Sequence, residues 1–359
     1  MVQETMFGVP SASDEFPHRP PADDRGLPFK DTWYFGLHDH TRDVSLAVHL
    51  TLSPNRSPGL RTTLSARWGR RRLQRTLYGV PSLGGDTVSG ELVSLRIVDP
   101  AWTPAKRLVL SVHCGDLVGE IELAGRFYGS NAAVLTPGMI PTGAGLFDLG
   151  HAEQACTATG RLTWSGESTE VDAYAYRDRS WGLRRSEYAT AAGFTFSQIH
   201  LPDATCGLLG WQHPDSTSND PMPVGAWRSD AGGIAAATGG ASLRGSAGIT
   251  EALRLEFPGG VTVDLRNGRQ LAEVFFTSHE PDMAGSGMGT MYWDQHLAFD
   301  SEQGPAFGVC NFGVPFPAEV FRSSVFCHAE PATTTAGGAT TATTTTATTT
   351  TATDTAAVR

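Results

Sequence analysis

The sequence lacks any apolar run of the roughly 18 residues that a membrane-spanning helix requires. Residues 1–30 are polar and rich in proline, without the apolar centre of a secretory signal. The five cysteines are dispersed and form no CxxC pair, a pattern typical of reduced thiols rather than a disulfide framework or a zinc site. We therefore expect a cytoplasmic protein with no integral membrane segment.

Positive charge is also scarce. The 359 residues carry a formal net charge of -10, which argues against a nucleic-acid partner because phosphate binding needs a basic face. The sequence contains no GxGxxG in a strand–helix context, no GKS/T loop and no GxSxG elbow. We expect no cofactor and no resident metal, and we infer no protein partner. A small apolar substrate fits this balance.

Sustained helical periodicity is nearly absent, whereas alternation is common. In Val44–Leu52 the even positions are apolar and the odd positions are mostly small or polar, which predicts a strand with one buried face. Similar patterns recur at 108–112, 117–123, 171–176, 194–199, 253–257, 261–265, 274–277 and 291–299.

Turn residues separate these strands, and Asn267–Gly268 between two apolar runs predicts a hairpin. Many short strands with frequent turns favour an all-β architecture of barrels or sandwiches, and a closed barrel can hold a small ligand. Length and an apolar content of 40% allow two cores. We therefore predict two barrel-like halves enclosing an apolar pocket. Residues 333–355, nearly all Thr and Ala, are predicted to be disordered.

The densest group of reactive side chains is Tyr174–Arg185. Alternation places Tyr174, Tyr176 and Asp178 on one face of a strand. Burial beside two phenols and near Trp181 would raise the pKa of Asp178 and keep it protonated as a proton donor, while aromatic faces would stabilise a cation. The alternative is a structural Asp–Arg pair with aromatic packing.

His151 and Glu153 share a strand face, and Gln154 lies on the other. His151 is a candidate second acid or base, or a structural histidine.

Near the start, Trp33, Tyr34 and Phe35 precede His38-x-His40. The aromatic residues are candidates for core or pocket wall. Two histidines two residues apart on a strand also have metal-ligand spacing, with His49, His113 or His151 as a third ligand. We keep this metal site as an alternative.

The stretch Tyr176–Gly182 resembles the carotenoid hydratase (hydroxyneurosporene synthase) and AttH-like superfamily, and 151–154 and 33–35 look similar to its landmarks. The resemblance covers about residues 30–325 and is strong only around 150–185. It implies two lipocalin-like halves and cofactor-free chemistry on an isoprenoid or other apolar substrate. In these hydratases water adds to a terminal alkene to give a tertiary alcohol.

The aromatic-x-Asp pair implicated in that family carries over to Tyr176 and Asp178, and Trp181 matches the family tryptophan. Two positions depart from the family. Arg179 stands where His or Asn is common and would favour the ionised form of Asp178 unless it points away. Thr32 stands where many relatives carry an acid.

These observations give a domain prediction: a polar arm (1–29), a first lipocalin-like domain (30–187), a second (188–330) and a tail (331–359). The predicted function is a cofactor-independent hydratase or dehydratase of a terpenoid alkene/tertiary-alcohol pair. Asp178, Tyr176, His151 and Glu153 are the predicted catalytic residues. Trp181, Tyr174, Trp33 and Tyr34 would bind the substrate. The alternatives are a lipid or terpenoid carrier and a cyclase or pericyclase of an apolar substrate.

Overall fold

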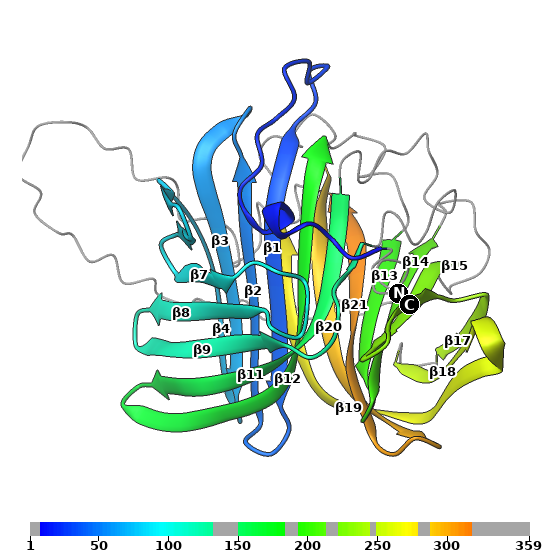
Figure 1. Ribbon diagram of the computed structural model, residues 1–359. Coiled ribbons are helices and arrows are strands. Elements are labelled where there is room, and N and C mark those ends of the chain that lie inside the picture. The colour runs from blue at the N-terminus through cyan, green and yellow to red at the C-terminus, as the bar shows by residue number, and fades with distance from the viewer. Residues whose placement is uncertain are drawn as a thin grey trace, which may run out of the picture.

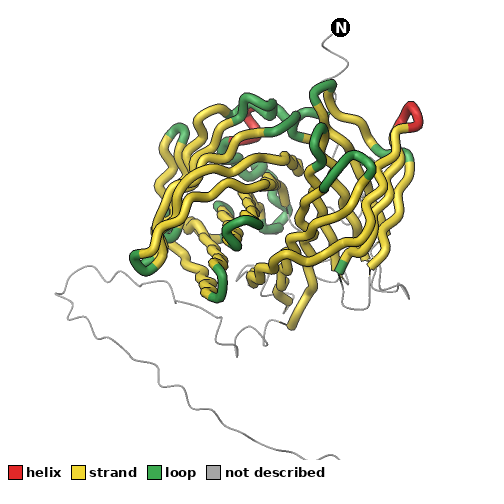
Figure 2. Tube along the Cα trace, turned by 90° about the horizontal axis from the view of Figure 1, so that it is seen from below, coloured by secondary structure: helices red, strands yellow, loops and turns green. Residues whose placement is uncertain are grey.

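A computed structural model describes residues 8–131, 150–183, 193–212, 222–244, 249–278 and 288–317. Within these ranges the chain is almost wholly β, and its strands form two antiparallel sheets that curl as half-barrels and lie side by side (Figures 1 and 2). The predicted all-β fold class with two lipocalin-like halves is confirmed.

The first sheet has twelve strands, and its hydrogen-bonded order is β4-β3-β2-β1-β12-β11-β9-β8-β7-β6-β5, with β10 paired to β11. They are β1 (Phe29–Asp39), β2 (Val44–Ser53), β3 (Ser57–Trp68), β4 (Arg71–Gly79), β5 (Ser82–Gly84), β6 (Thr87–Ser89), β7 (Val93–Asp99), β8 (Arg107–Cys114), β9 (Leu117–Gly125), β10 (Ser130–Asn131), β11 (Gly150–Trp164) and β12 (Glu167–Leu183).

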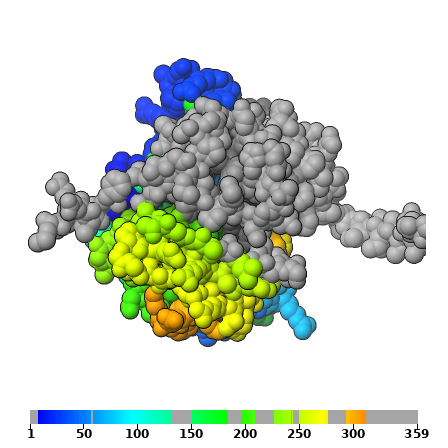
Figure 3. Space-filling model, turned by 90° about the vertical axis from the view of Figure 1, so that its right-hand side faces the viewer, coloured from blue at the N-terminus to red at the C-terminus, as the bar shows by residue number. Residues whose placement is uncertain are grey.

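The second sheet has nine strands in the order β16-β15-β14-β13-β21-β20-β19-β18-β17. They are β13 (Gly193–His200), β14 (Ala204–Gln212), β15 (Met222–Asp230), β16 (Gly233–Ala236), β17 (Gly239–Arg244), β18 (Thr250–Phe257), β19 (Val261–Ser278), β20 (Met288–Ser301) and β21 (Ala306–Pro317). On the face in Figure 3 these strands form the lower surface, and the blue segment before β1 projects at the top.

Each sheet encloses its own core, and a third apolar cluster joins the two. The alternating side chains of β2, such as Leu46, Val48 and Leu50, fill the concave side of the first sheet. Leu253, Leu255 and other residues fill the second. Between the sheets lies a smaller cluster of Tyr34, Ala47, Tyr176, Phe196, Trp227, Val274 and Val309. We call this contact region the junction.

The expected hairpin at Asn267–Gly268 is wrong. Both residues lie inside the continuous strand β19, where the pairing with β20 shifts between Arg266 and Arg269. Asn267 has a φ of 55°, and its side-chain amide donates to Asp300 at 2.9 Å. Asn-Gly favours left-handed backbone in a bulge as well as in a hairpin turn, which is why the local pattern was ambiguous.

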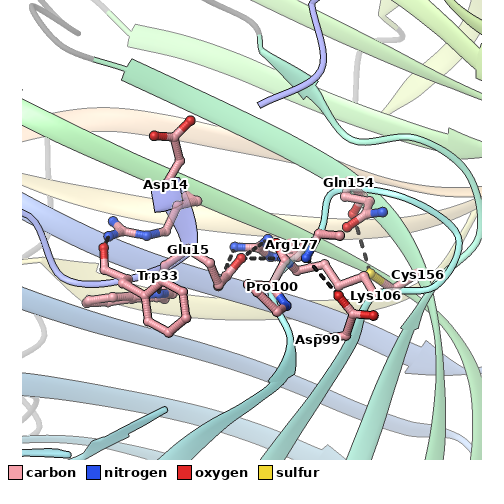
Figure 4. A network of polar contacts seen from close by, with 12 residues as sticks. Asp14, Glu15, Trp33, Asp99, Pro100, Lys106, Gln154, Cys156 and Arg177 are labelled. Carbon is pink, nitrogen blue, oxygen red and sulfur yellow. Dashed lines mark hydrogen bonds and ion pairs between the residues drawn. The ribbon is translucent and has the colours of Figure 1, made fainter. Parts of the chain in front are cut away.

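The segment before β1 is anchored to the first sheet by a buried acid. The 3-10 helix η2 (Ala12–Glu15) ends at Glu15, which is fully buried. Glu15 forms a bidentate pair with Arg177 at 2.7 and 3.1 Å, and Lys106 Nζ lies 2.5 Å from its Oε2 (Figure 4). The Trp33 indole donates to the Glu15 carbonyl at 3.1 Å. This anchor was not predicted from the sequence, in which residues 1–29 were expected only to form a polar arm.

No helix in the described ranges has the length and apolar character needed to cross a membrane. The predicted disordered stretch 333–355 lies outside the described residues. The strands of the two sheets fall within 29–183 and 193–317, and the domain boundaries proposed from the sequence remain a prediction.

Candidate active site

The two faces of β1 and β12 have different surroundings. Trp33, Phe35 and Leu37 of β1 point into the first core, whereas Tyr34 points into the junction. In β12, Ala173 and Ala175 likewise face the core. The side chains that alternate with them, Tyr174, Tyr176 and Asp178, face away from it. The reactive face of β12 is therefore turned toward the second sheet, not into a barrel.

Strand register brings the polar side chains into one row. Asp178 is the cross-strand partner of Tyr34 on β1 and of Glu153 on β11, and Tyr34 is also the partner of His49 on β2. Direct cross-strand partners on one face lie close enough for their side chains to interact. His151 lies two residues before Glu153 and so projects from the same face.

These residues form a compact acid–base cluster. His151 Nε2 lies 2.6 Å from Glu153 Oε1 and 3.2 Å from Asp178 Oδ2. The exposed fraction is 3% for His151 and 1% for Glu153, whereas the Asp178 side chain is 26% exposed. Glu153 Oε2 and Asp178 Oδ1 accept no hydrogen bond from the described residues. These two buried carboxylate oxygens thus retain unused hydrogen-bonding capacity.

The pKa values of the three groups are shifted in different directions. Burial works against the charge on His151, but Asp178 and Glu153 outweigh it and raise the pKa of His151 to about 10. Burial, followed by the charge of Asp178, raises the pKa of Glu153 to about 8. Burial also acts to raise the pKa of Asp178, yet His151 and other nearby cations bring it below its usual value.

The expected raised pKa of Asp178 is therefore wrong, because the sequence analysis did not place His151 beside it. At neutral pH, His151 is an imidazolium, Asp178 is ionised and Glu153 holds a proton. Since the groups are tightly coupled, their protons belong to the cluster as a whole.

The second sheet contributes a further carboxylate, Asp294 on β20, which is fully buried. Tyr34 and Tyr176 both donate their phenolic hydroxyls to the same oxygen, Asp294 Oδ2, and the Tyr176 bond measures 3.2 Å. Burial, followed by the charge of Asp294, raises the pKa of each phenol well above 10. The two phenols are thus held neutral with their protons directed at Asp294.

Aromatic side chains from both sheets surround these phenols. The Tyr34 and Tyr176 ring centroids are 5.4 Å apart, and Tyr176 lies 5.6 Å from Phe196 of β13. Phe196 in turn lies 6.5 Å from Trp227 of β15. Such π-faces stabilise positive charge.

A pocket adjoins this group at the junction. Tyr174 and Tyr176 form part of its wall, together with Gly36, His38, His40, Ala175, His200, Leu271, His296, Leu297, Phe307, Gly308 and Val309. Its cavity volume of about 20 Å³ is enough for a water molecule. The pocket predicted from the sequence was apolar; this one lies between the halves, and its mostly apolar wall also contains four histidines.

Two predicted substrate-binding residues lie elsewhere. Trp181 is on the opposite face of β12 from Asp178 and stacks on His18 with centroids 4.4 Å apart. Trp33 lies in the first core beneath Arg179. Odd and even positions of a strand face opposite sides, so neither side chain joins the cluster. Tyr34 and Tyr174 do lie at the junction, at the phenol pair and the pocket wall respectively.

Arg179 also points away from Asp178. It forms a buried ion pair with Asp31 and donates to the Phe16 carbonyl at 2.8 Å. Gln154 projects to that side too and donates to the carbonyls of Thr103 and Phe127. The departure at Arg179 from the family motif therefore places no cation against the Asp178 carboxylate.

Asp294 was not among the site residues predicted from the sequence. The segment 291–299 was recognised as a strand, and a charged residue within an apolar alternating strand is a signal of a buried polar site. Its partners Tyr34 and Tyr176 are 260 and 118 residues away in sequence, so the local pattern contained no information about the contact.

The alternative metal site at His38-x-His40 gains no third ligand among the described residues. His38 hydrogen-bonds Ser45 at 2.9 Å, His40 stacks on Phe307, and His113 contacts the Gly90 carbonyl. The one described group with ligand atoms mutually within 4.8 Å is His151, Glu153 and Asp178. In it, His151 and Glu153 are at direct hydrogen-bond distance, so a metal ion would have to separate them.

Three solved structures are similar to this chain, and the first two share its architecture. An AttH-type protein from Nitrosomonas europaea has a TM-score of 0.51 at 12% identity, with 82% of this chain and 97% of that chain covered. CghA, in a structure with Sch210972, has a TM-score of 0.53 at 12% identity, with coverages of 88% and 97%. Kievitone hydratase from Nectria haematococca has a TM-score of 0.47 at 13% identity, with coverages of 87% and 94%. Such low identities show no more than a shared fold.

No curated protein sequence matches the chain. A family model described as "Domain of unknown function (DUF7064)" matches residues 11–243. This range includes every strand of the first sheet, with the cluster of His151, Glu153 and Asp178, and continues into the second. Because the match spans more than half of the sequence, the chain belongs to the DUF7064 family.

Proposed function

We propose that this protein is a cofactor-independent hydratase or dehydratase that interconverts an alkene and a tertiary alcohol of an apolar, isoprenoid-type substrate by acid catalysis. The observation that carries the proposal is the His151–Glu153–Asp178 cluster, in which the buried Glu153 carboxyl group keeps its proton at neutral pH and two carboxylate oxygens lack a hydrogen-bond partner among the described residues. A general acid needs a pKa near the working pH, and Glu153 meets this condition better than Asp178.

In the hydration direction, Glu153 transfers its proton to one alkene carbon, and the π-electrons form the new C–H bond. The adjacent carbon becomes a tertiary cation, which the faces of Tyr34, Tyr176, Phe196 and Trp227 stabilise. Water attacks the cation and loses a proton to give the alcohol. Dehydration follows the same steps in reverse.

Asp178 and His151 support the donor electrostatically. The negative charge of Asp178 raises the pKa of Glu153, and the imidazolium of His151 holds both carboxyl groups in place. The residue roles proposed from the motif thus change in one respect. Glu153 is the proton donor, and Asp178 raises the pKa of Glu153. Tyr176 keeps its proposed place beside the cation.

The test is incubation of the purified protein in deuterated water, without added cofactor, with linalool, myrcene, limonene, α-terpineol and a longer acyclic isoprenoid. Gas chromatography–mass spectrometry should detect a tertiary alcohol with carbon-bound deuterium, or its dehydration product. The rate should fall as pH rises through about 8, where Glu153 loses its proton.

Glu153→Gln should lower turnover about 100-fold or more, the usual effect of removing a general acid. Glu170→Gln, at an exposed surface pair with Arg161, is the matched control and should not change it. If Glu153→Gln stays active and Asp178→Asn is dead, Asp178 is the donor after all. An apolar ligand retained without turnover would identify a carrier, and a product of unchanged elemental composition would identify a cyclase.

A further inference from the structure

A pair of phenols interacts with both carboxylate sites of the junction. The charges of Asp294 and Asp178 both act on Tyr34. Tyr176 is likewise influenced by both Asp294 and Glu153. In strand register, Tyr34 is the direct partner of Asp178, while its hydroxyl reaches across the junction to Asp294. The phenols therefore connect the acid cluster of the first sheet to a separate carboxylate of the second.

Apolar packing between the two sheets does not require a buried carboxylate such as Asp294. Moving a carboxylate out of water costs several kcal/mol unless hydrogen bonds compensate. Here two phenols converge on a single oxygen of a fully buried side chain. A tie between two sheets would need only a neutral acceptor, such as an amide. A charged acceptor fits a site that takes up a proton.

A pocket of about 20 Å³, which is enough for a water molecule, adjoins the phenol pair at Tyr176, which forms part of its wall. The acid-cluster residues His151, Glu153 and Asp178 are not among the described residues that line this pocket. Water and proton donor are therefore kept at different positions.

We propose that Tyr34 and Asp294 form the proton-accepting end of the reaction, with Tyr34 as a further catalytic residue and Asp294 as the residue that positions it. This inference rests on the proposed function. As water bonds to the tertiary cation, it gives a proton to the Tyr34 oxygen, and the Tyr34 hydroxyl proton passes to Asp294. One proton has then left Glu153 and one has arrived at Asp294, and exchange with solvent restores both groups. Tyr176 holds the accepting oxygen in place from the other side.

The two ends of the reaction can be measured separately in deuterated water. Reversible protonation by Glu153 exchanges hydrogen for deuterium at the alkene carbon without forming alcohol, whereas alcohol formation also needs the acceptor. Asp294→Asn should therefore lower the kcat of alcohol formation at least 100-fold, with KM little changed, while alkene exchange continues. Glu153→Gln should abolish both. Asp294→Glu, which restores the charge, should recover part of the alcohol formation.

Tyr34→Phe provides a second route if Asp294→Asn fails to fold, because it keeps the ring and removes only the hydroxyl. It should show the same loss of alcohol with retained exchange. If wild type is active and both variants form alcohol at the wild-type rate, Asp294 and Tyr34 are structural and the inference falls while the proposed function stands. If exchange and hydration fall together in both folded variants, the separation of the two ends is also refuted. If wild type converts no substrate of the panel and exchanges no alkene hydrogen, the proposed function and this inference fall together.

Discussion

Arg177 and Asp178 are adjacent in sequence, yet their side chains lie on opposite sides of β12. Arg177 turns into the first core and pairs with Glu15, whereas Asp178 turns into the junction and contacts His151. The anchor of the N-terminal segment and the acid cluster are therefore attached to the same few residues of backbone. A change on either side of this strand is expected to affect the other.

Glu15→Gln is expected to destabilise the fold strongly. It would leave the buried cations Arg177 and Lys106 without their carboxylate, and breaking a buried ion pair costs about 3–5 kcal/mol. Urea unfolding of the variant measures the loss. Glu167→Gln, which breaks the exposed pair with Arg71, is the control and should change the midpoint little. Equal midpoints for the two variants would show that the Glu15 network adds nothing to stability.

Acid should weaken the junction through its buried histidines. Burial lowers the pKa of His38 to about 4 and of His200 to about 3, and it lowers that of His296 well below 6.5. Below pH about 6.5 the unfolded chain binds protons that the folded protein refuses, so stability present above this pH is lost as pH falls toward 4. Each histidine contributes a slope of about 1.4 kcal/mol per pH unit in this window.

Unfolding free energies measured between pH 7.5 and 4.5 test this prediction. His200→Gln should reduce the slope by about one proton. An identical slope in wild type and His200→Gln would mean that His200 is not held neutral.

Gly36→Ala should disturb the phenol pair. A methyl group at this position would overlap the Tyr176 ring, which must then shift from Asp294. Overpacking of this kind costs about 1–3 kcal/mol, and the proposed turnover should fall as well. Gly84→Ala, where an added methyl meets open space, is the control for thermal unfolding. A wild-type melting temperature in Gly36→Ala would show that the ring has room to move.

The buried thiols should resist reagents in the native state. Cys114, Cys156, Cys206 and Cys310 are all buried, and burial raises the pKa of Cys156 and Cys206 to about 12. Since the thiolate is the reactive form, Ellman's reagent should label these four only after unfolding. A Cys327→Ser variant removes the remaining cysteine from the assay. Rapid labelling of the native variant would contradict the burial.

The fold was predictable because alternation is a local signal. The even positions of Val44–Leu52 face one core, and they show this in the sequence itself. The bulge at Asn267 was not predictable, because the same dipeptide serves a turn or a bulge according to the strand that it pairs with.

The candidate site also has a part that was predictable from the sequence and a part that was not. The alternation of side chains along a strand predicted that Tyr176 and Asp178 share a face and that His151 and Glu153 share a face. It did not predict that the two pairs contact each other. That arrangement depends on the register of β11 against β12. Period two also separates Trp181 from Asp178, whereas proximity in sequence had suggested a shared pocket. Asp294 required the docking of a second sheet, which no local pattern encodes.

The hydrogen bond from Tyr34 to Asp294 has a consequence for the order in which the site is assembled during synthesis. Domains emerge from the ribosome and fold from the N-terminus onward. The acid cluster lies entirely on strands that precede residue 184, but the carboxylate that orders the phenols arrives with β20 at residues 288–301. A nascent chain thus carries its acid groups well before their counterpart, and the site becomes complete only after β20 has been synthesised.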